Sequence, residues 1–266
     1  MEVFRAIVLG VAQGLAEFLP ISSSGHLRLL QDGLGWNEFG LAFDTLLHVG
    51  TLLAVVAYFR DDIRSLVAAS FTREPARAHD RRLAWLIVVA TVPTGVIGLI
   101  GADWFENAGL LLVGIAFLIT AAALVVAELS SRRSVHDATG LGWHSALLVG
   151  VAQGVAVMPG ISRSGATMAS GLGLGLDREQ AARFSFLLSG PIILLAALKQ
   201  AADLIGGTAE LPSTLAATAG FLAASVTGYI AIAGLIAYVR TRSFYPFAAY
   251  TALVGTAVVV WQVSAG

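Results

Sequence analysis

Six long stretches of apolar residues run along the chain, each close to the length of a membrane-spanning helix. A bilayer core about 30 Å thick is crossed by roughly 20 mainly apolar residues in helical conformation. Polar connections that often contain Gly or Pro separate the stretches. The pattern predicts six transmembrane helices over residues 41–59, 83–101, 109–127, 184–202, 215–239 and 244–263.

Two further apolar segments, 3–20 and 145–159, fit poorly as complete spans. Each contains Gln, Gly and Pro and runs into a Ser- and Gly-rich turn. Non-helical backbone at membrane depth is tolerated where it lines a cavity in the protein. We therefore expect an all-α integral membrane protein with two re-entrant helical hairpins besides the six spans. Gln13 and Glu17 interrupt the first segment, which disfavours a signal peptide.

The two hairpin segments are copies of one another. A shift of 140 residues aligns 6–25 with 146–165 without a gap, and eleven of these twenty positions are identical. If each half holds one hairpin and three crossings, the odd number of crossings inverts the second half. We expect a single membrane domain built from an inverted-topology repeat, with halves at about 1–128 and 141–266.

The charges between the spans predict the orientation in the membrane. Arg residues gather in three connections, and the positive-inside rule places those connections in the cytoplasm and both termini outside the cell. The Arg residues are Arg60, Arg64, Arg73, Arg77, Arg81, Arg82, Arg132, Arg133, Arg240 and Arg242, whereas the two remaining connections carry Asp103, Glu106 and Glu210.

Composition agrees with a membrane protein and removes two classes of function. Hydrophobic residues make up 57% of the 266 positions and charged residues 12%, against about 25% charged in a typical soluble domain. The 29 Gly residues suit helices that pack closely in a bilayer. A formal net charge of -1 gives no basic surface for nucleic acid, so we expect no such partner. The absence of Cys excludes thiolate catalysis and Cys-bound metals.

The first hairpin carries polar residues where they are costly in a membrane and usually functional. Gln13 and Glu17 lie four residues apart on one helix face, and their oxygens suit a hard divalent cation. The turn Ser22-Ser23-Ser24-Gly25 offers hydroxyls and amides to an anion. His26 follows and can transfer protons or attack a substrate. The alternatives are an interhelical hydrogen bond for Glu17 and plain packing for His26.

The second hairpin repeats the turn with an Arg in place of the middle Ser. A guanidinium at membrane depth needs an anionic partner and fits a phosphate through two N–H groups. Arg163 is therefore a candidate phosphate ligand, with a buried pair to Glu17 as the alternative. Asp44, His48 and Lys199 are weaker candidates, and Asp44 and His48, four apart, are expected to bond each other.

Both turns resemble the motifs of the undecaprenyl-diphosphatases, also called bacitracin-resistance proteins. The family motif Glu/Gln-x-x-x-Glu, followed by a Ser-rich Gly-His turn, matches 13–17 and 22–26. The motif Pro-Gly-x-Ser-Arg-Ser-x-x-Thr matches 159–167 at every defined position. The resemblance covers the whole chain and implies a phosphatase of polyprenyl diphosphate assisted by Mg²⁺ or Ca²⁺. It implies metal or acid–base roles for Gln13 and Glu17, chemistry at Ser23 and His26, and phosphate binding at Ser162, Arg163, Ser164 and Thr167.

We therefore expect a multi-pass enzyme of the cell membrane that recycles the lipid carrier of cell-envelope glycans. Its polyprenyl diphosphate substrate would lie between the helices, in the bilayer, with the headgroup among Ser22, Ser24, Gly25 and the second turn. We favour Ser23 as nucleophile with His26 as its base; direct attack by His26, or by water that His26 activates, stays open. The rival is a transporter or flippase of polyprenyl phosphate on the same repeat. The oligomeric state is open, with a homodimer as one candidate.

Overall fold

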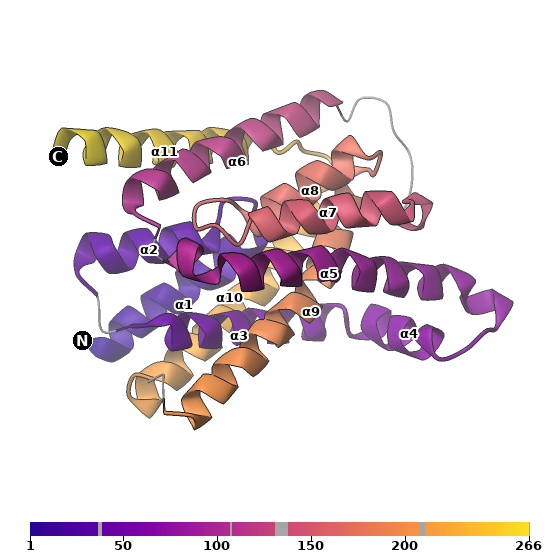
Figure 1. The fold of residues 1–266 in the computed structure, drawn as a ribbon, viewed down its shortest axis with the longest axis horizontal. Coiled ribbons are helices and arrows are strands. Elements are labelled where there is room, and N and C mark those ends of the chain that lie inside the picture. Colours follow the sequence, from indigo (N-terminus) through magenta and orange to yellow (C-terminus); the bar gives the residue numbers. More distant parts are fainter. Residues whose placement is uncertain (37–38, 107, 131–137, 208–210, 266) are drawn as a thin grey trace.

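In the computed structural model of the chain, the described residues form a bundle of helices (Figure 1). The structure describes residues 1–36, 39–106, 108–130, 138–207 and 211–265. Among the charges used for orientation, Arg132, Arg133 and Glu210 lie outside these ranges, as do the side chains of Asp103 and Glu106. Both termini lie at the same end of the molecule, at the left of Figure 1.

Six helices in the described ranges are long and apolar enough to cross a membrane, which confirms the predicted spans. Two of them begin five or six residues before the predicted stretch, because polar residues open the helix. In α9 the side chain of Asp177 caps the start by accepting a hydrogen bond from the Gln180 amide at 2.8 Å. The six are α3 (Leu41–Tyr58), α5 (Ala78–Glu106), α6 (Leu110–Ser130), α9 (Arg178–Ile205), α10 (Thr214–Val239) and α11 (Tyr245–Ala265).

Each hairpin segment forms two helices joined by a short turn. The first comprises α1 (Glu2–Phe18) and α2 (Ser23–Leu34), and the second comprises α7 (Trp143–Val155) and α8 (Arg163–Gly173). The same capping bond starts α2 and α8, where the serine hydroxyl at the N-cap accepts from the amide of a glycine three residues later. The re-entrant placement of these helices in a bilayer stays a prediction.

Glycines shared by the two hairpins let them approach neighbouring helices closely. A Cβ added to Gly10 would lie 2.3 Å from the Gly220 carbonyl oxygen on α10, and one added to Gly150 would lie 2.1 Å from the Ala90 carbonyl oxygen on α5. Thus α1 packs against α10, and α7 packs against α5. The first helix of each half therefore packs against a spanning helix of the other half, as expected of an internal repeat. The inverted relation of the two halves stays a prediction.

Ion pairs link the start of α9 to the ends of α6 and α10 and to the segment that follows α3. The short helix α4 (Arg60–Ser70) follows α3, and the one-turn helices η1 (Pro75–Arg77) and η3 (Ala138–Gly140) precede α5 and α7. The start of α9 forms the ion pairs Arg183–Asp62 at 2.6 Å, Arg178–Glu128 at 2.6 Å and Arg240–Glu179 at 2.8 Å. The ends of α3, α6 and α10 therefore lie at one end of the bundle, as expected if they share a membrane face. That this face is cytoplasmic stays a prediction.

Candidate active site

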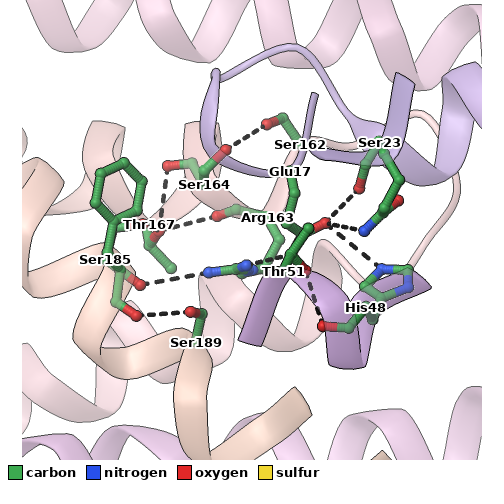
Figure 2. Close-up of polar contacts among 12 residues, drawn as sticks. Glu17, Ser23, His48, Thr51, Ser162, Arg163, Ser164, Thr167, Ser185 and Ser189 are labelled. Atoms are coloured by element: carbon green, nitrogen blue, oxygen red, sulfur yellow. Dashed lines mark hydrogen bonds and ion pairs between the residues drawn. The ribbon is translucent and has the colours of Figure 1, made fainter. Parts of the chain in front are cut away.

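Glu17, in the last turn of α1, lies at the centre of the polar contacts between the helices (Figure 2). Its side chain is 5% exposed. Oε2 accepts hydrogen bonds from Gln13 Nε2 at 3.0 Å and from the Ser23 hydroxyl at 2.5 Å, and lies 3.5 Å from His48 Nε2. Oε1 accepts a hydrogen bond from Arg163 Nη2. One buried carboxylate therefore connects α1, α2, α3 and α8, and the buried pair with Arg163 is the one that the sequence left as an alternative.

The backbone turn before α2 directs Ser23 toward this carboxylate. Ser22 has φ 70°, the only positive φ of a non-glycine residue in the described ranges. An L-residue rarely adopts this conformation, and such strain is typical of functional turns. The turn ends where the Ser22 hydroxyl accepts from the Gly25 amide at 3.3 Å, and a Cβ at Gly25 would lie 2.6 Å from the Phe117 ring. The Ser22 cap and the lack of a side chain at Gly25 together fix Ser23 as the first residue of α2.

Ser23 and Arg163 occupy equivalent positions in the two hairpins, 140 residues apart. Each is the first residue of the second helix of its hairpin, and each donates to a different oxygen of Glu17. The position equivalent to Glu17 in the second hairpin is Val157. The duplicated turns therefore converge on a single carboxylate that only one of them supplies.

Helix α9 supports Arg163 from the other side. Arg163 Nη1 donates to the Ser185 carbonyl at 3.3 Å, and the Thr167 and Ser185 hydroxyls lie 2.6 Å apart. Ser189 follows one turn later and donates to the Phe186 carbonyl at 2.6 Å. Sequence reasoning missed Ser185 and Ser189, although two serines four residues apart in an apolar helix are a signal of a polar face.

The remaining serines of the two turns form hydrogen bonds mostly within the turns or between them. The Ser162 hydroxyl accepts from the Gly165 amide at 3.0 Å and lies 3.2 Å from the Ser164 hydroxyl, while Ser164 donates to the Leu19 carbonyl at 3.1 Å. In the first turn, the hydroxyls of Ser22 and Ser24 lie 3.5 Å apart. These contacts bring the first residues of α2 and α8 to the same carboxylate. Helix N-termini with free N–H groups favour anions, so the place suits a phosphate.

His26 lies one helical turn beyond Ser23 but does not contact its hydroxyl. Nδ1 lies 2.7 Å from the Ser22 carbonyl oxygen and Nε2 lies 2.8 Å from the Tyr250 hydroxyl. The expected hydrogen bond between Ser23 and His26 is therefore not the arrangement in the structure. The spacing of three residues places both side chains on one face of α2, but the ring turns toward the Ser22 carbonyl and α11. Tyr250 is 224 residues away, and no sequence signal pointed to it.

The weaker candidates have mixed outcomes. His48 reaches Glu17, and its Nδ1 lies 2.8 Å from the backbone carbonyl oxygen of Asp44. The carboxylate of Asp44 instead accepts from Gln31 Nε2 of α2 at 2.8 Å, so the expected side-chain bond between Asp44 and His48 is replaced by a backbone one. Lys199 pairs with Asp203 at 3.3 Å on the exposed surface of α9.

The oxygens of Gln13 and Glu17 fit a hard divalent cation in type. Gln13 Oε1 is buried and accepts no hydrogen bond from any described residue, and the equivalent Gln153 Oε1 is in the same condition. Within the described ranges no group of three His, Cys, Asp or Glu could hold a metal by itself. A Mg²⁺ ion commonly takes only one or two carboxylates and completes its shell with substrate phosphates and water. The donor set therefore suits a cation that binds together with a phosphate.

The fold and the buried polar contacts around Glu17 define a multi-pass membrane protein with a polar centre between its helices. A family model described as "Bacitracin resistance protein BacA" matches residues 6–257. The chain therefore belongs to this family, as the two turn motifs indicated.

Relatives match over nearly their whole length. The chain is 43% identical to a protein of Methanosphaera stadtmanae over 278 residues, which cover 99% of each chain. It is 41% identical to one of Myxococcus xanthus, covering 98% of this chain and 89% of the relative. A protein of Rubrobacter xylanophilus is 43% identical over 94% of each chain. All three relatives are named undecaprenyl-diphosphatase.

Proposed function

We propose that this protein is an undecaprenyl-diphosphatase. It hydrolyses the terminal phosphoanhydride of the lipid to give undecaprenyl monophosphate and inorganic phosphate, and so recycles the carrier of cell-envelope glycans. The observation that carries the proposal is the Ser23 hydroxyl hydrogen-bonded at 2.5 Å to a buried carboxylate that also holds Arg163. Family membership and the names of the relatives support the same activity.

Ser23 is the nucleophile in this mechanism, and Glu17 is its base. The hydroxyl oxygen attacks the terminal phosphorus while its proton passes to Glu17 Oε2, and the bond to the bridging oxygen breaks. Undecaprenyl monophosphate leaves and a phosphoserine remains. A water then attacks the phosphoserine, losing its own proton, and the serine oxygen regains a proton from Glu17. His26 is assigned to the water step, because it lies one helical turn from Ser23 and the proton of Ser23 already has an acceptor.

Arg163 is the proposed phosphate clamp. Its guanidinium carries several N–H donors in one plane, and Nη2 exchanges the Glu17 carboxylate for the phosphoryl oxygens when substrate binds. Donors held in place before the reaction stabilise the charge that develops in the transition state. The Ser185 carbonyl keeps Nη1 in position during this exchange. We assign the N-terminal amides of α2 and α8 to the same phosphate, together with the hydroxyls of Ser162, Ser164 and Thr167.

A divalent cation, Mg²⁺ or Ca²⁺, completes the proposal. Gln13 Oε1 and Glu17 would hold it, with phosphate oxygens as further ligands. When bound, the cation supplies positive charge that offsets the charge developing on the leaving phosphate. Its place is supported by the buried Gln13 Oε1, which accepts no hydrogen bond from a described residue.

The test measures phosphate release by purified protein in detergent. Wild-type protein should release phosphate from undecaprenyl diphosphate, and Ser23→Ala should not. When substrate labelled on the terminal phosphate is quenched rapidly in acid, wild-type protein should retain acid-stable label and Ser23→Ala none. Acid-labile label lost in His26→Ala would assign attack to His26, and absence of label under both acid and base quenching would assign it to water.

The same assay discriminates the transporter alternative, which the comparisons do not support. Detergent micelles separate no compartments, so a pure flippase would release no phosphate. Placement of both termini outside the cell, and association as a homodimer, belong to the proposal as finer predictions. Labelling of introduced cysteines tests the first, and the mass of the protein in detergent solution tests the second.

A further inference from the structure

The ring of His26 is held by a tyrosine from the last helix of the chain. Tyr250 of α11 places its hydroxyl 2.8 Å from His26 Nε2. Its ring stacks on the imidazole with an interplanar angle of 8° and a centroid distance of 5.6 Å. The ring of Phe117 on α6 meets the imidazole edge-on, at 5.1 Å and 86°. Two helices that are remote in sequence from α2 therefore fix the plane of this imidazole.

The two ring nitrogens have partners of different kinds, and this determines where the proton lies. Nδ1 faces the Ser22 carbonyl oxygen at 2.7 Å, and a carbonyl can only accept, so Nδ1 carries a hydrogen. In the neutral imidazole Nε2 then has a lone pair, which accepts the hydroxyl hydrogen of Tyr250. When the imidazole is protonated, Nε2 donates to the Tyr250 oxygen instead. A phenol can donate or accept, so Tyr250 bonds the ring in both protonation states.

Helix α11, which carries Tyr250, packs closely on α6, which carries Phe117. A Cβ added to Gly255 would lie 2.8 Å from the Gly114 carbonyl oxygen and 2.9 Å from Cβ of Phe117. Such backbone approach through glycines is a common way for membrane helices to associate tightly. The backbones that carry Tyr250 and Phe117 are therefore held close together beside His26.

We propose that Tyr250 positions His26 and passes a proton to it: its hydroxyl, together with the Ser22 carbonyl, holds the imidazole in one orientation in both protonation states. This inference rests on the proposed phosphatase function, in which the attacking water gives a proton to the Tyr250 oxygen while the hydroxyl hydrogen of Tyr250 passes to His26 Nε2. A mispositioned acid–base group lowers the rate of the step that it serves, without changing how tightly substrate binds.

The test replaces the hydroxyl alone. Tyr250→Phe keeps the stacked ring, and we expect kcat to fall about tenfold with kcat/KM within about twofold of wild type, because the water step follows the release of undecaprenyl monophosphate. The matched control is Tyr229→Phe on α10, whose ring contacts Tyr58 at 5.6 Å and which should keep wild-type kcat. In a His26→Ala background, Tyr250→Phe should change the residual kcat by less than about twofold, because the partner is gone.

A spectroscopic measurement separates this inference from the proposed function. In protein labelled with ¹⁵N-histidine, His26→Gln identifies the resonances of His26 among those of the five histidines. Tyr250→Phe should move the Nε2 resonance toward that of an unbonded imidazole nitrogen, and Tyr229→Phe should leave it in place. If wild-type protein releases no phosphate, the proposed function fails. The Nε2 resonance tests the contact independently of activity: an unmoved resonance in Tyr250→Phe would show that the contact is absent.

Three results would overturn the positioning role. The first is wild-type kcat in Tyr250→Phe, whatever the resonance does. The second is a loss of kcat with an unmoved Nε2 resonance. The third is an equal loss in Tyr229→Phe or in the His26→Ala background, because a general loss of packing would act in all of these proteins.

Discussion

Replacing Arg163 by Lys tests whether the guanidinium or merely its charge is needed. The Arg163 side chain is 15% exposed and Glu17 5%, so the two groups meet largely out of water. Lysine keeps the positive charge, but its ammonium cannot match the plane of a phosphate with two N–H groups. Loss of one preorganised donor to a transition-state oxygen costs about 2.7–4 kcal/mol, or roughly 10²–10³ in rate. We therefore expect kcat/KM of Arg163→Lys to fall by about that factor, nearly as far as in Arg163→Ala.

The stability of Arg163→Lys should change much less than its activity. Removing one partner of a buried ion pair typically costs about 3–5 kcal/mol, because an uncompensated charge stays behind. Lysine leaves a cation near Glu17, and Glu17 keeps its bonds to Gln13 and Ser23 and its contact with His48. We expect a loss nearer that of one hydrogen bond to a charged group, about 1.5–3 kcal/mol.

Arg178→Lys is the matched control. Arg178 makes a two-bond contact with the buried Glu128 carboxylate at 2.9 and 2.6 Å, at the end of the bundle where the α9 ion pairs lie. Its replacement should lower the melting temperature and leave kcat/KM within about threefold of wild type, since surviving folded protein has an intact site. Near-normal turnover by Arg163→Lys would refute the clamp. A pure loss of melting temperature in both variants would assign Arg163 a structural role.

The other predictions concern the carboxylate, its amide neighbour and the orientation. Glu17→Gln should abolish phosphate release, and any residual activity should not respond to added Mg²⁺ or Ca²⁺. A fully active variant would show that Glu17 is not part of the site. Gln13→Met should lower kcat, whereas Gln153→Met, which loses a bond to a threonine hydroxyl at 2.9 Å, should lower only thermal stability. Cysteine introduced at Asp103 should react with impermeant reagents outside the cell and cysteine at Thr72 should not; the reverse labelling would invert the predicted topology.

Features that depend on neighbouring residues in the sequence were predictable. The six spans follow from apolar runs of bilayer length. The pairing of Glu17 with Arg163 could be foreseen as an alternative, because each charge needs a partner at membrane depth. Hydropathy and charge thus identified the elements and one buried contact between the halves.

Contacts that depend on how distant helices pack were not predictable. Spacing placed Ser23 and His26 on one face of α2, but the direction of the imidazole is decided by Tyr250 and Phe117 on helices far along the chain. In the same way, the carboxylate of Asp44 turned to Gln31 of α2 rather than to its neighbour on α3. Periodicity shows which side chains share a face but carries no information on which partner lies opposite.

The two turns give one carboxylate two partners in the proposed reaction: the serine that it deprotonates and the arginine that binds the phosphate. Ser23 and Arg163 lie at equivalent positions of the two turns, and each donates a hydrogen bond to a different oxygen of Glu17. Had both turns kept a carboxylate, two negative charges would face the same diphosphate and oppose its binding; Val157 removes one of them. Had both turns kept the serine, no guanidinium would be present to neutralise the phosphate. In the proposed reaction, the differences at positions 17/157 and 23/163 therefore give the site a base and a nucleophile from one half and an anion-binding cation from the other.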